Sequence, residues 1–387
     1  MRALLQNCRL IPELSGGCTM GLTDILIEDG TISRVAAKGT LPREENTVDC
    51  QGKTLMPGLF DMHMHINWAY HNGEIRLDDF KIFVESCRSA RLYLDNGVTT
   101  VRDMGSARRV AAAVRSAIQA DVCVGPRILC SGYILDPVAR AVPPDPYNFL
   151  REFSGCDELV RAVREEVGGG ADVIKLYAPG EPCHLLPEEL RAAVRIASIH
   201  HKPVAVHAHD LSAIRMCLDE GAHTIEHGSY IDAECIERLK EEKSYLVPTL
   251  AVLSHEIATP GYTPEMKKQV LRPLLEANEK NIGAAYRAGL KLGFGTDTPI
   301  EELDRLPGME FRMRKEHCGM ENVDLLLQAT KYSAEIAGLA GVTGEIREGL
   351  CADMILVDGN PDEDISAMYQ RPLRVWARGV PYQPRKK

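Results

Sequence analysis

From Pro57 onward the chain alternates short apolar runs with longer amphipathic segments, and this alternation limits the folds it can adopt. Eight runs have the character of strands: Leu59–His65, Val98–Asp103, Arg127–Ser131, Val173–Tyr177, Val204–His207, His223–His227, Tyr245–Leu250 and Leu290–Asp297. Most are separated by segments of helical periodicity, such as Glu158–Val167, Pro187–His200 and Leu211–Glu220. Strands that alternate with helices form parallel βαβ units. Eight such units predict an α/β fold of the (β/α)8 TIM-barrel type.

The two ends of the chain lack a helical period and have the pattern of strands and turns instead. The β-like segments near the start are Leu4–Ile11, Gly21–Glu28, Ile32–Val35 and Thr47–Leu55, and those near the end are Ala352–Asp358 and Leu373–Ala377. We expect residues 1–56 and 343–387 to pair in one small β-sandwich domain. The barrel of residues 57–342 would then be inserted between its two halves.

Charge and hydropathy narrow the classes of partner. The formal net charge is −10, and the first dense basic run is Arg385-Lys386-Lys387, so we expect no nucleic-acid partner. No run of eighteen apolar residues occurs, and polar residues follow Met1 too soon for a signal peptide. These features predict a cytoplasmic protein with a small-molecule substrate and no membrane partner, which we further expect to be a homo-oligomer.

The cysteines point to the same compartment. There are 12, scattered along the chain, and none forms a CxxC pair. This usage is typical of reduced thiols in a cytosolic enzyme and not of a disulfide framework.

Metal-competent side chains close several of the predicted strands. Because positions i and i+2 of a strand share a face, His63 and His65 should point together into the barrel mouth, where imidazoles suit a divalent metal. Alone, such a pair is often incidental. His207, His227 and Asp297 also stand at the ends of strand-like runs. Since barrel active sites are built at the carboxyl ends of the strands, the set predicts a metal centre.

Lys175 lies inside the apolar run Val173–Tyr177. A lysine there could extend its amine to solvent or pair with a nearby carboxylate. Alternatively, burial would lower the pKa of the amine, and a neutral amine can take up CO2 to form a carbamate. Beside four histidines and an aspartate, we favour a carbamate on Lys175 that bridges two cations.

The motifs around these residues resemble the amidohydrolase superfamily over nearly the whole chain. Pro57–His65 is similar to its first-strand signature, and Gly344–Gly349 with Ala352–Asp358 is similar to its closing strands. Val173–Lys175, Pro203–His209 and Thr224–Gly228 look most like prolidase-like and metallo-carboxypeptidase-like members, with imidazolonepropionase relatives nearby. The resemblance implies two zinc ions, held as follows: one by His63, His65 and Asp297, the other by His207 and His227, with carboxylated Lys175 bridging them.

Two departures from that subgroup fall at positions that contact substrate. His209 stands where relatives often have a tyrosine near the substrate carboxylate, and residues 132–140 replace a Gly-Gly-His stretch. We expect His209, Tyr230 and Arg140 to bind the substrate, because a carboxylate calls for a cation or several donors.

The predicted function is hydrolysis of an amide bond in a small N-acyl amino acid or dipeptide by a metal-bridging hydroxide, with Asp297 moving the proton to the leaving amine. A cyclic-amide hydrolase of the imidazolone or hydantoin type is an alternative, and a lactone or phosphotriester could be cleaved by the same apparatus. A non-catalytic barrel is disfavoured by the intact ligand set, and a mononuclear deaminase would leave Lys175 without a role.

Overall fold

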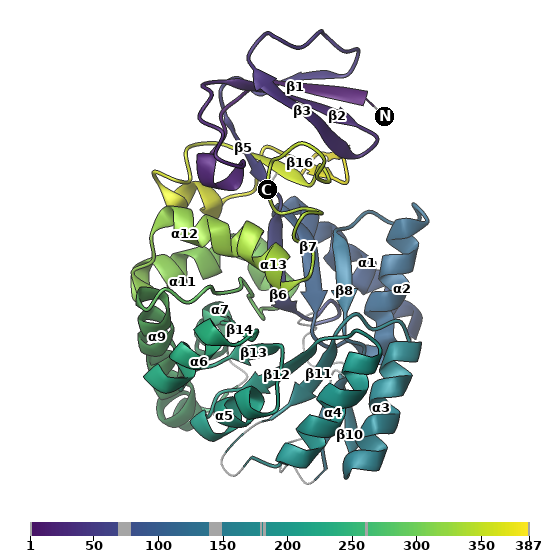
Figure 1. The fold of residues 1–387 in the computed structure, drawn as a ribbon, viewed down its shortest axis with the longest axis vertical. Helices are drawn as coiled ribbons and strands as arrows, with labels where there is room; N and C mark the ends of the chain where they lie inside the picture. The colour runs from purple at the N-terminus through teal and green to yellow at the C-terminus, as the bar shows by residue number, and fades with distance from the viewer. Residues whose placement is uncertain are drawn as a thin grey trace.

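Two sheet systems make up the fold: a barrel of parallel strands and, at one end of it, a smaller region of mostly antiparallel strands (Figure 1). The computed structural model describes residues 2–68, 79–138, 149–178, 180, 183–259 and 262–385. Among these residues, every helix is too short or too polar to cross a bilayer.

The smaller region is built from both ends of the chain. One sheet has the strand order β3-β2-β1-β4 and consists of β1 (Arg2–Cys8), β2 (Thr23–Glu28), β3 (Thr31–Ala37) and β4 (Thr47–Asp49). The other has the order β17-β16-β15-β5 and consists of β5 (Thr54–Pro57), β15 (Met354–Val357), β16 (Arg374–Ala377) and β17 (Val380–Tyr382). Residues of both sheets, including Leu5, Ile25, Met354 and Trp376, share one buried cluster. The domain limits at residues 56 and 343 stay a prediction.

The barrel wall has strands at seven of the eight predicted runs. They are β6 (Leu59–Met64), β7 (Val98–Asp103), β8 (Arg127–Cys130), β11 (Ile174–Tyr177), β12 (Val204–Ala208), β13 (Thr224–His227) and β14 (Tyr245–Val247). The sequence did not predict β9 (Ile134–Pro137), which pairs with β11 on one side and with β10 (Leu150–Phe153) on the other. The backbone N–H of Asp172 donates to Cys130 O, which joins β8 to the segment entering β11. The TIM-barrel prediction is therefore confirmed.

Helices cover the outside of the barrel (Figure 1). The longer ones are α1 (Asp79–Asp95), α2 (Val110–Gln119), α3 (Cys156–Gly168), α4 (Pro187–Ile199), α5 (Leu211–Asp219), α6 (Ala233–Glu241), α7 (Leu250–Ala258), α9 (Arg272–Arg287) and α11 (Met309–Cys318). The shorter ones are α8 (Pro264–Met266), α10 (Ile300–Arg305), α12 (Asn322–Leu327) and α13 (Ser333–Ile336). The helices bury one stripe: in α3, Leu159, Ala162 and Val163 face the core, together with Glu166, whose carboxylate is paired with Arg109.

Three details differ from the predicted strands. The run Leu290–Asp297 forms no regular strand, although Leu292 bridges Leu246 and the N–H of Asp297 donates to His63 O, which closes the barrel. The run Tyr245–Leu250 ends as a strand at Val247, because Pro248 has no N–H to continue the ladder. The predicted strand Thr47–Leu55 is two strands, interrupted by a turn in which both Gln51 and Gly52 have positive φ.

Candidate metal centre

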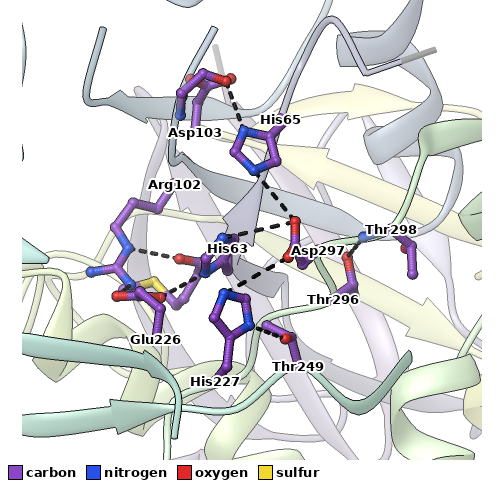
Figure 2. A network of polar contacts seen from close by, with 12 residues as sticks. His63, His65, Arg102, Asp103, Glu226, His227, Thr249, Thr296, Asp297 and Thr298 are labelled. Carbon is purple, nitrogen blue, oxygen red and sulfur yellow. Dashed lines mark hydrogen bonds and ion pairs between the residues drawn. The ribbon is translucent and has the colours of Figure 1, made fainter. Parts of the chain in front are cut away.

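The first group of candidate ligands joins β6 to the segment that closes the barrel. His63 lies on β6 and His65 directly follows its last residue, and both side chains are directed at Asp297 (Figure 2). The His65 Nε2 atom is 3.3 Å from Asp297 Oδ1, and the His63 Nε2 atom is 3.8 Å from the same oxygen. The three ligand atoms lie within 4.8 Å of one another, a spacing that could hold one metal ion.

A second group stands across Asp297 from the first. It consists of His207, His209 and His227, whose ligand atoms also lie within 4.8 Å of one another. The ring centroids of His207 and His227 are 4.5 Å apart. The His227 Nε2 atom is 4.0 Å from Asp297 Oδ2, so Asp297 faces both groups.

Lys175 enters the centre from β11, next to β12. Its side chain is among the largest fully buried ones, and its Nζ atom has no hydrogen-bond partner among the described residues. Burial lowers the pKa of the amine to about 8, although the nearby carboxylates of Glu226 and Asp297 act in the opposite direction. A fraction of the amine is therefore neutral near pH 7.5, the form able to add CO2.

Two buried polar atoms without a hydrogen bond among the described residues show whether the centre suits a metal ion. Both Lys175 Nζ and His227 Nε2 are buried and make no hydrogen bond within the described part of the chain. Leaving such polar atoms dry and unpaired costs on the order of 1–3 kcal/mol each. A divalent cation would satisfy the imidazole directly, and a carbamate would convert the lysine into an oxygen ligand. The donor set of imidazole nitrogen and carboxylate oxygen is one that zinc accepts, so the residues fit the group that the sequence predicts.

The candidate histidines are held in orientation by their Nδ1 atoms. His63 Nδ1 is 2.8 Å from Glu226 Oε2, and His65 Nδ1 is 2.8 Å from Gly105 O. Because a carboxylate and a carbonyl only accept, both Nδ1 atoms carry the proton, and each Nε2 presents its lone pair to the centre. His227 Nδ1 is 2.6 Å from Thr249 Oγ1.

Burial keeps most of these imidazoles neutral. It lowers the pKa of both His63 and His209 to about 4 and the pKa of His227 well below its ordinary value. His65 is the exception, because the Asp297 carboxylate outweighs burial and raises its pKa. A neutral imidazole is the form that binds a metal ion.

A buried ion pair supports His63 from behind. Arg102 on β7 donates from Nη2 to Glu226 Oε1 at 2.8 Å and from Nε to Met62 O at 2.7 Å. Burial alone would raise the pKa of Glu226, but Arg102 and His63 reverse this and lower it to about 2. This pair was not predicted from the sequence. The available signal was a charged residue at a buried position in each of two strands, β7 and β13.

The segment before Asp297 is fitted closely to β6. Asp61 accepts hydrogen bonds from the backbone N–H of Thr296 at 3.0 Å and from its hydroxyl at 2.6 Å (Figure 2 shows Thr296 beside Asp297). A Cβ atom on Gly295 would lie 2.8 Å from the His63 Cβ, so only glycine fits there. Asp297 itself has a φ of 49°, a left-handed conformation that an aspartate tolerates at some cost in energy.

The predicted substrate contacts have different outcomes. The His209 ring stacks on His227 with centroids 4.7 Å apart, and its Nδ1 is 2.8 Å from Ser229 Oγ, so it lies among the candidate ligands. Tyr230 follows β13, its side chain is 39% exposed, and its N–H donates to His209 O. Arg140 lies outside the described residues.

Aromatic rings that the sequence analysis did not single out line the two groups. Tyr177 stacks on His207 with centroids 4.0 Å apart, and Phe149 stacks on His65 at 4.9 Å. Neither residue belongs to a motif, and both reach the centre only through the packing of β10 and β11.

We expect the Glu226→Gln substitution to lower the free energy of unfolding by about 3 kcal/mol, because Arg102 would be left as a buried charge without its partner. Metal affinity should fall roughly 10–100-fold, since His63 loses the carboxylate that orients it. Denaturant unfolding and metal titration measure the two effects. The Glu226→Gln/Arg102→Met double variant should recover stability but not metal affinity; recovery of both would contradict an orienting role. Glu237→Gln, in an exposed pair with Lys240, is the control.

Comparisons with known proteins cover the same residues. The model named "Amidohydrolase family" matches residues 54–381. Ochratoxinase of Aspergillus niger is 29% identical over 402 residues, which span 92% of this chain and 82% of that protein. Imidazolonepropionase of Hyphomonas neptunium is 26% identical over 96% of this chain and 97% of its own length. A solved prolidase complexed with N-methylphosphonate-L-proline superimposes with a TM-score of 0.87, at 27% identity and full coverage of both chains.

Proposed function

The chain belongs to the amidohydrolase family, and from this premise we propose that it cleaves an amide bond in a small N-acyl amino acid or dipeptide with the help of divalent metal. One observation carries the proposal: two groups of potential ligands face each other across Asp297, with the buried Lys175 amine beside them. A structural role alone does not account for so many buried titratable groups at the carboxyl ends of strands.

The proposed metal centre holds two zinc ions. His63, His65 and Asp297 would hold one ion and His207 and His227 the other, while Lys175, as a carbamate, would reach both. Bound there, the ions would polarise a substrate carbonyl and lower the pKa of a water molecule towards 7. Because His209 lies in the second group, it has two proposed roles, as a further metal ligand and as a contact for the substrate.

Asp297 is the proposed proton carrier. Burial raises the pKa of this carboxyl, but the attraction of His63, His65 and Lys175 is larger and lowers it below the ordinary value. Asp297 is therefore anionic at neutral pH and able to accept the proton of the attacking water. It can then deliver that proton to the leaving nitrogen, which must be protonated before the amide bond breaks.

The substrate should carry a free carboxylate beside the scissile bond. The similar prolidase is complexed with N-methylphosphonate-L-proline, whose tetrahedral phosphorus on a proline nitrogen resembles an amide in the course of hydrolysis. His209 and the neighbouring Tyr230 have polar side-chain atoms that could hydrogen-bond the substrate carboxylate. Arg140 remains a proposed partner for the two carboxylate oxygens.

A cyclic amide is the second candidate. It is favoured by the similarity to imidazolonepropionase, which extends over 96% of this chain. A neutral ring needs no cation for a carboxylate, so the two candidates differ in how they depend on the charge of the substrate.

Metal analysis combined with a substrate screen tests the proposal. Protein produced with ample zinc should contain about two equivalents per chain and should turn over members of a dipeptide, N-acyl amino acid or cyclic-amide library. Removal of the metal by a chelator should abolish turnover, and added zinc should restore it. Well under one equivalent, or turnover that survives the chelator, would contradict the metal-dependent function.

Amidation of the substrate carboxylate should lower kcat/KM by about tenfold or more, because a lost charge-assisted hydrogen bond costs roughly 1.5–3 kcal/mol. The best acid substrate from the screen and its amide are compared in steady-state assays. His209→Ala should cause a similar loss with the acid and little with the amide. Equal turnover of acid and amide forms would favour the cyclic-amide candidate.

A further inference from the structure

A polar cavity lies at the opposite end of the barrel from the metal centre. Its volume is about 450 Å³, and its lining comes from the second half of α2, the start of β8, Asp172 just before β11, the turn between β16 and β17, and Leu339. Where barrel strands contribute, at β8 and β11, the lining is at their amino ends, whereas the candidate ligands stand at the carboxyl ends of the barrel strands. In Figure 1, β8 and α2 are neighbours on the side of the barrel below β16.

Three arginines line this cavity: Arg115, Arg127 and Arg378. Arg115 is paired with Asp172 and donates to Gly170 O at 2.8 Å. Asp172 is the only carboxylate among the lining residues. The lining therefore has a net positive charge, although the chain as a whole has a net charge of −10.

The arginines are incompletely paired. Arg127 Nη2 is 3.1 Å from the buried carboxylate of Asp353, but its Nε atom is buried and makes no hydrogen bond with the described residues. The Arg378 guanidinium donates a long hydrogen bond, 3.5 Å, to Gly125 O. Three guanidinium groups therefore stand against two carboxylates, and several N–H donors remain available for an acceptor.

The rest of the lining is largely apolar. Ile118, Pro126, Ile128 and Leu339 contribute to the wall beside the arginines. A cavity of a few hundred cubic ångströms accommodates a small organic molecule. Guanidinium groups match carboxylate and phosphate oxygens in geometry as well as charge. The combination fits a ligand with an anionic head and an apolar body.

We propose that this cavity, defined by Arg115, Arg127 and Arg378, binds a small organic anion with a carboxylate or phosphate head on an apolar body. The site is separate from the metal centre, and the proposal does not depend on the proposed function. The anion would supply the negative charge that the three arginines lack and would accept hydrogen bonds from the Arg378 guanidinium.

Isothermal titration calorimetry with phenyl phosphate, benzoate and the uncharged benzyl alcohol tests the proposal on the metal-loaded protein. At least one of the two anions should bind with a dissociation constant on the order of 1 mM, and the alcohol should not bind at that concentration. The two anions distinguish a phosphate-binding site from a carboxylate-binding site. Absence of saturable binding by both anions at roughly ten times that concentration would overturn the proposal.

Two variants with opposite expected effects assign the binding to the cavity. Arg378→Gln should weaken it about tenfold, because a charge-assisted hydrogen bond is lost. Asp172→Asn should tighten it several-fold, since it removes the negative charge that competes for Arg115. Arg195→Gln, on the exposed face of α4, is the matched control and should change nothing. Equal affinity of the Arg378→Gln and Arg195→Gln proteins would overturn the proposal, because an anion bound at the metal centre would be unaffected by both.

Discussion

Replacing Lys175 by methionine should reduce the bound metal from about two equivalents per chain to less than one and lower kcat/KM about 10³-fold. Methionine has a similar volume, so the barrel should fold, but it cannot form a carbamate. The expected loss follows from the several kcal/mol of transition-state stabilisation that a metal ion supplies. Elemental analysis and steady-state assays measure both quantities. Retention of two metals and normal turnover would show that Lys175 is not a ligand.

The same substitution should stabilise the metal-free protein, and this separates loss of metal from loss of fold. The Lys175 amine is fully buried and makes no hydrogen bond with any residue that the structure describes, so its removal should raise the free energy of unfolding by about 1–3 kcal/mol. Urea unfolding in the presence of a chelator measures this change. Lys291→Met, at an exposed pair with Glu335, should shift stability by no more than about 0.5 kcal/mol.

If Lys175 is carboxylated, we expect a short-chain acid to rescue the Lys175→Ala variant in part. Its truncated side chain leaves room for a short-chain carboxylic acid, whose oxygens can stand where the carbamate oxygens would be. Propionate should therefore restore part of the metal binding and part of the turnover. Rescue by propionate but not by propionamide would identify the missing group as an anionic oxygen ligand.

The positions of the candidate ligands could be predicted because strand periodicity is local. His63 and His65 share a face whenever the segment is extended, and parallel strands deliver His207 and His227 to the same end of the barrel. The fold class followed from the same alternation. These inferences need only the order of residues along the chain and the direction of the strands.

Other parts of the centre depend on contacts that no local pattern contains. Gly105 O and Thr249 hold His65 and His227 in place, yet each is an ordinary residue in its own segment. The irregular path of residues 290–297 is set by hydrogen bonds to Asp61, which is 235 positions away from Thr296 in the sequence.

The pairing of Arg102 with Glu226 is an intermediate case. A charge within a buried strand is costly, so each of the two residues signals that a partner exists. The sequence could not supply the identity of the partner, because five strands separate β7 from β13 in chain order.

The Asp297→Asn substitution should lower kcat by at least about 10²-fold, the scale of general-base catalysis. Asparagine keeps the shape of the side chain and one carbonyl oxygen, but its amide cannot accept a proton at neutral pH. Metal content must be measured beside kcat, because Asp297 is also a candidate ligand for the group with His63 and His65.

Comparison with a second carboxylate separates the proton-carrying role from a general effect of charge. Glu256 on α7 is partly buried and accepts a hydrogen bond from the Tyr262 hydroxyl at 2.6 Å, and burial raises the pKa of its carboxyl to about 7. It belongs to neither group of candidate ligands. Glu256→Gln should therefore leave kcat within a few-fold of the native value. If Asp297→Asn retains its metal and turns over normally, another group must carry the proton. If both variants lose activity equally, the negative charge near the centre matters more than the position of the base. The proposed mechanism requires a large loss in Asp297→Asn alone, with the metal still bound, because the Asp297 carboxylate reaches His65 at 3.3 Å and His227 at 4.0 Å, one histidine of each group.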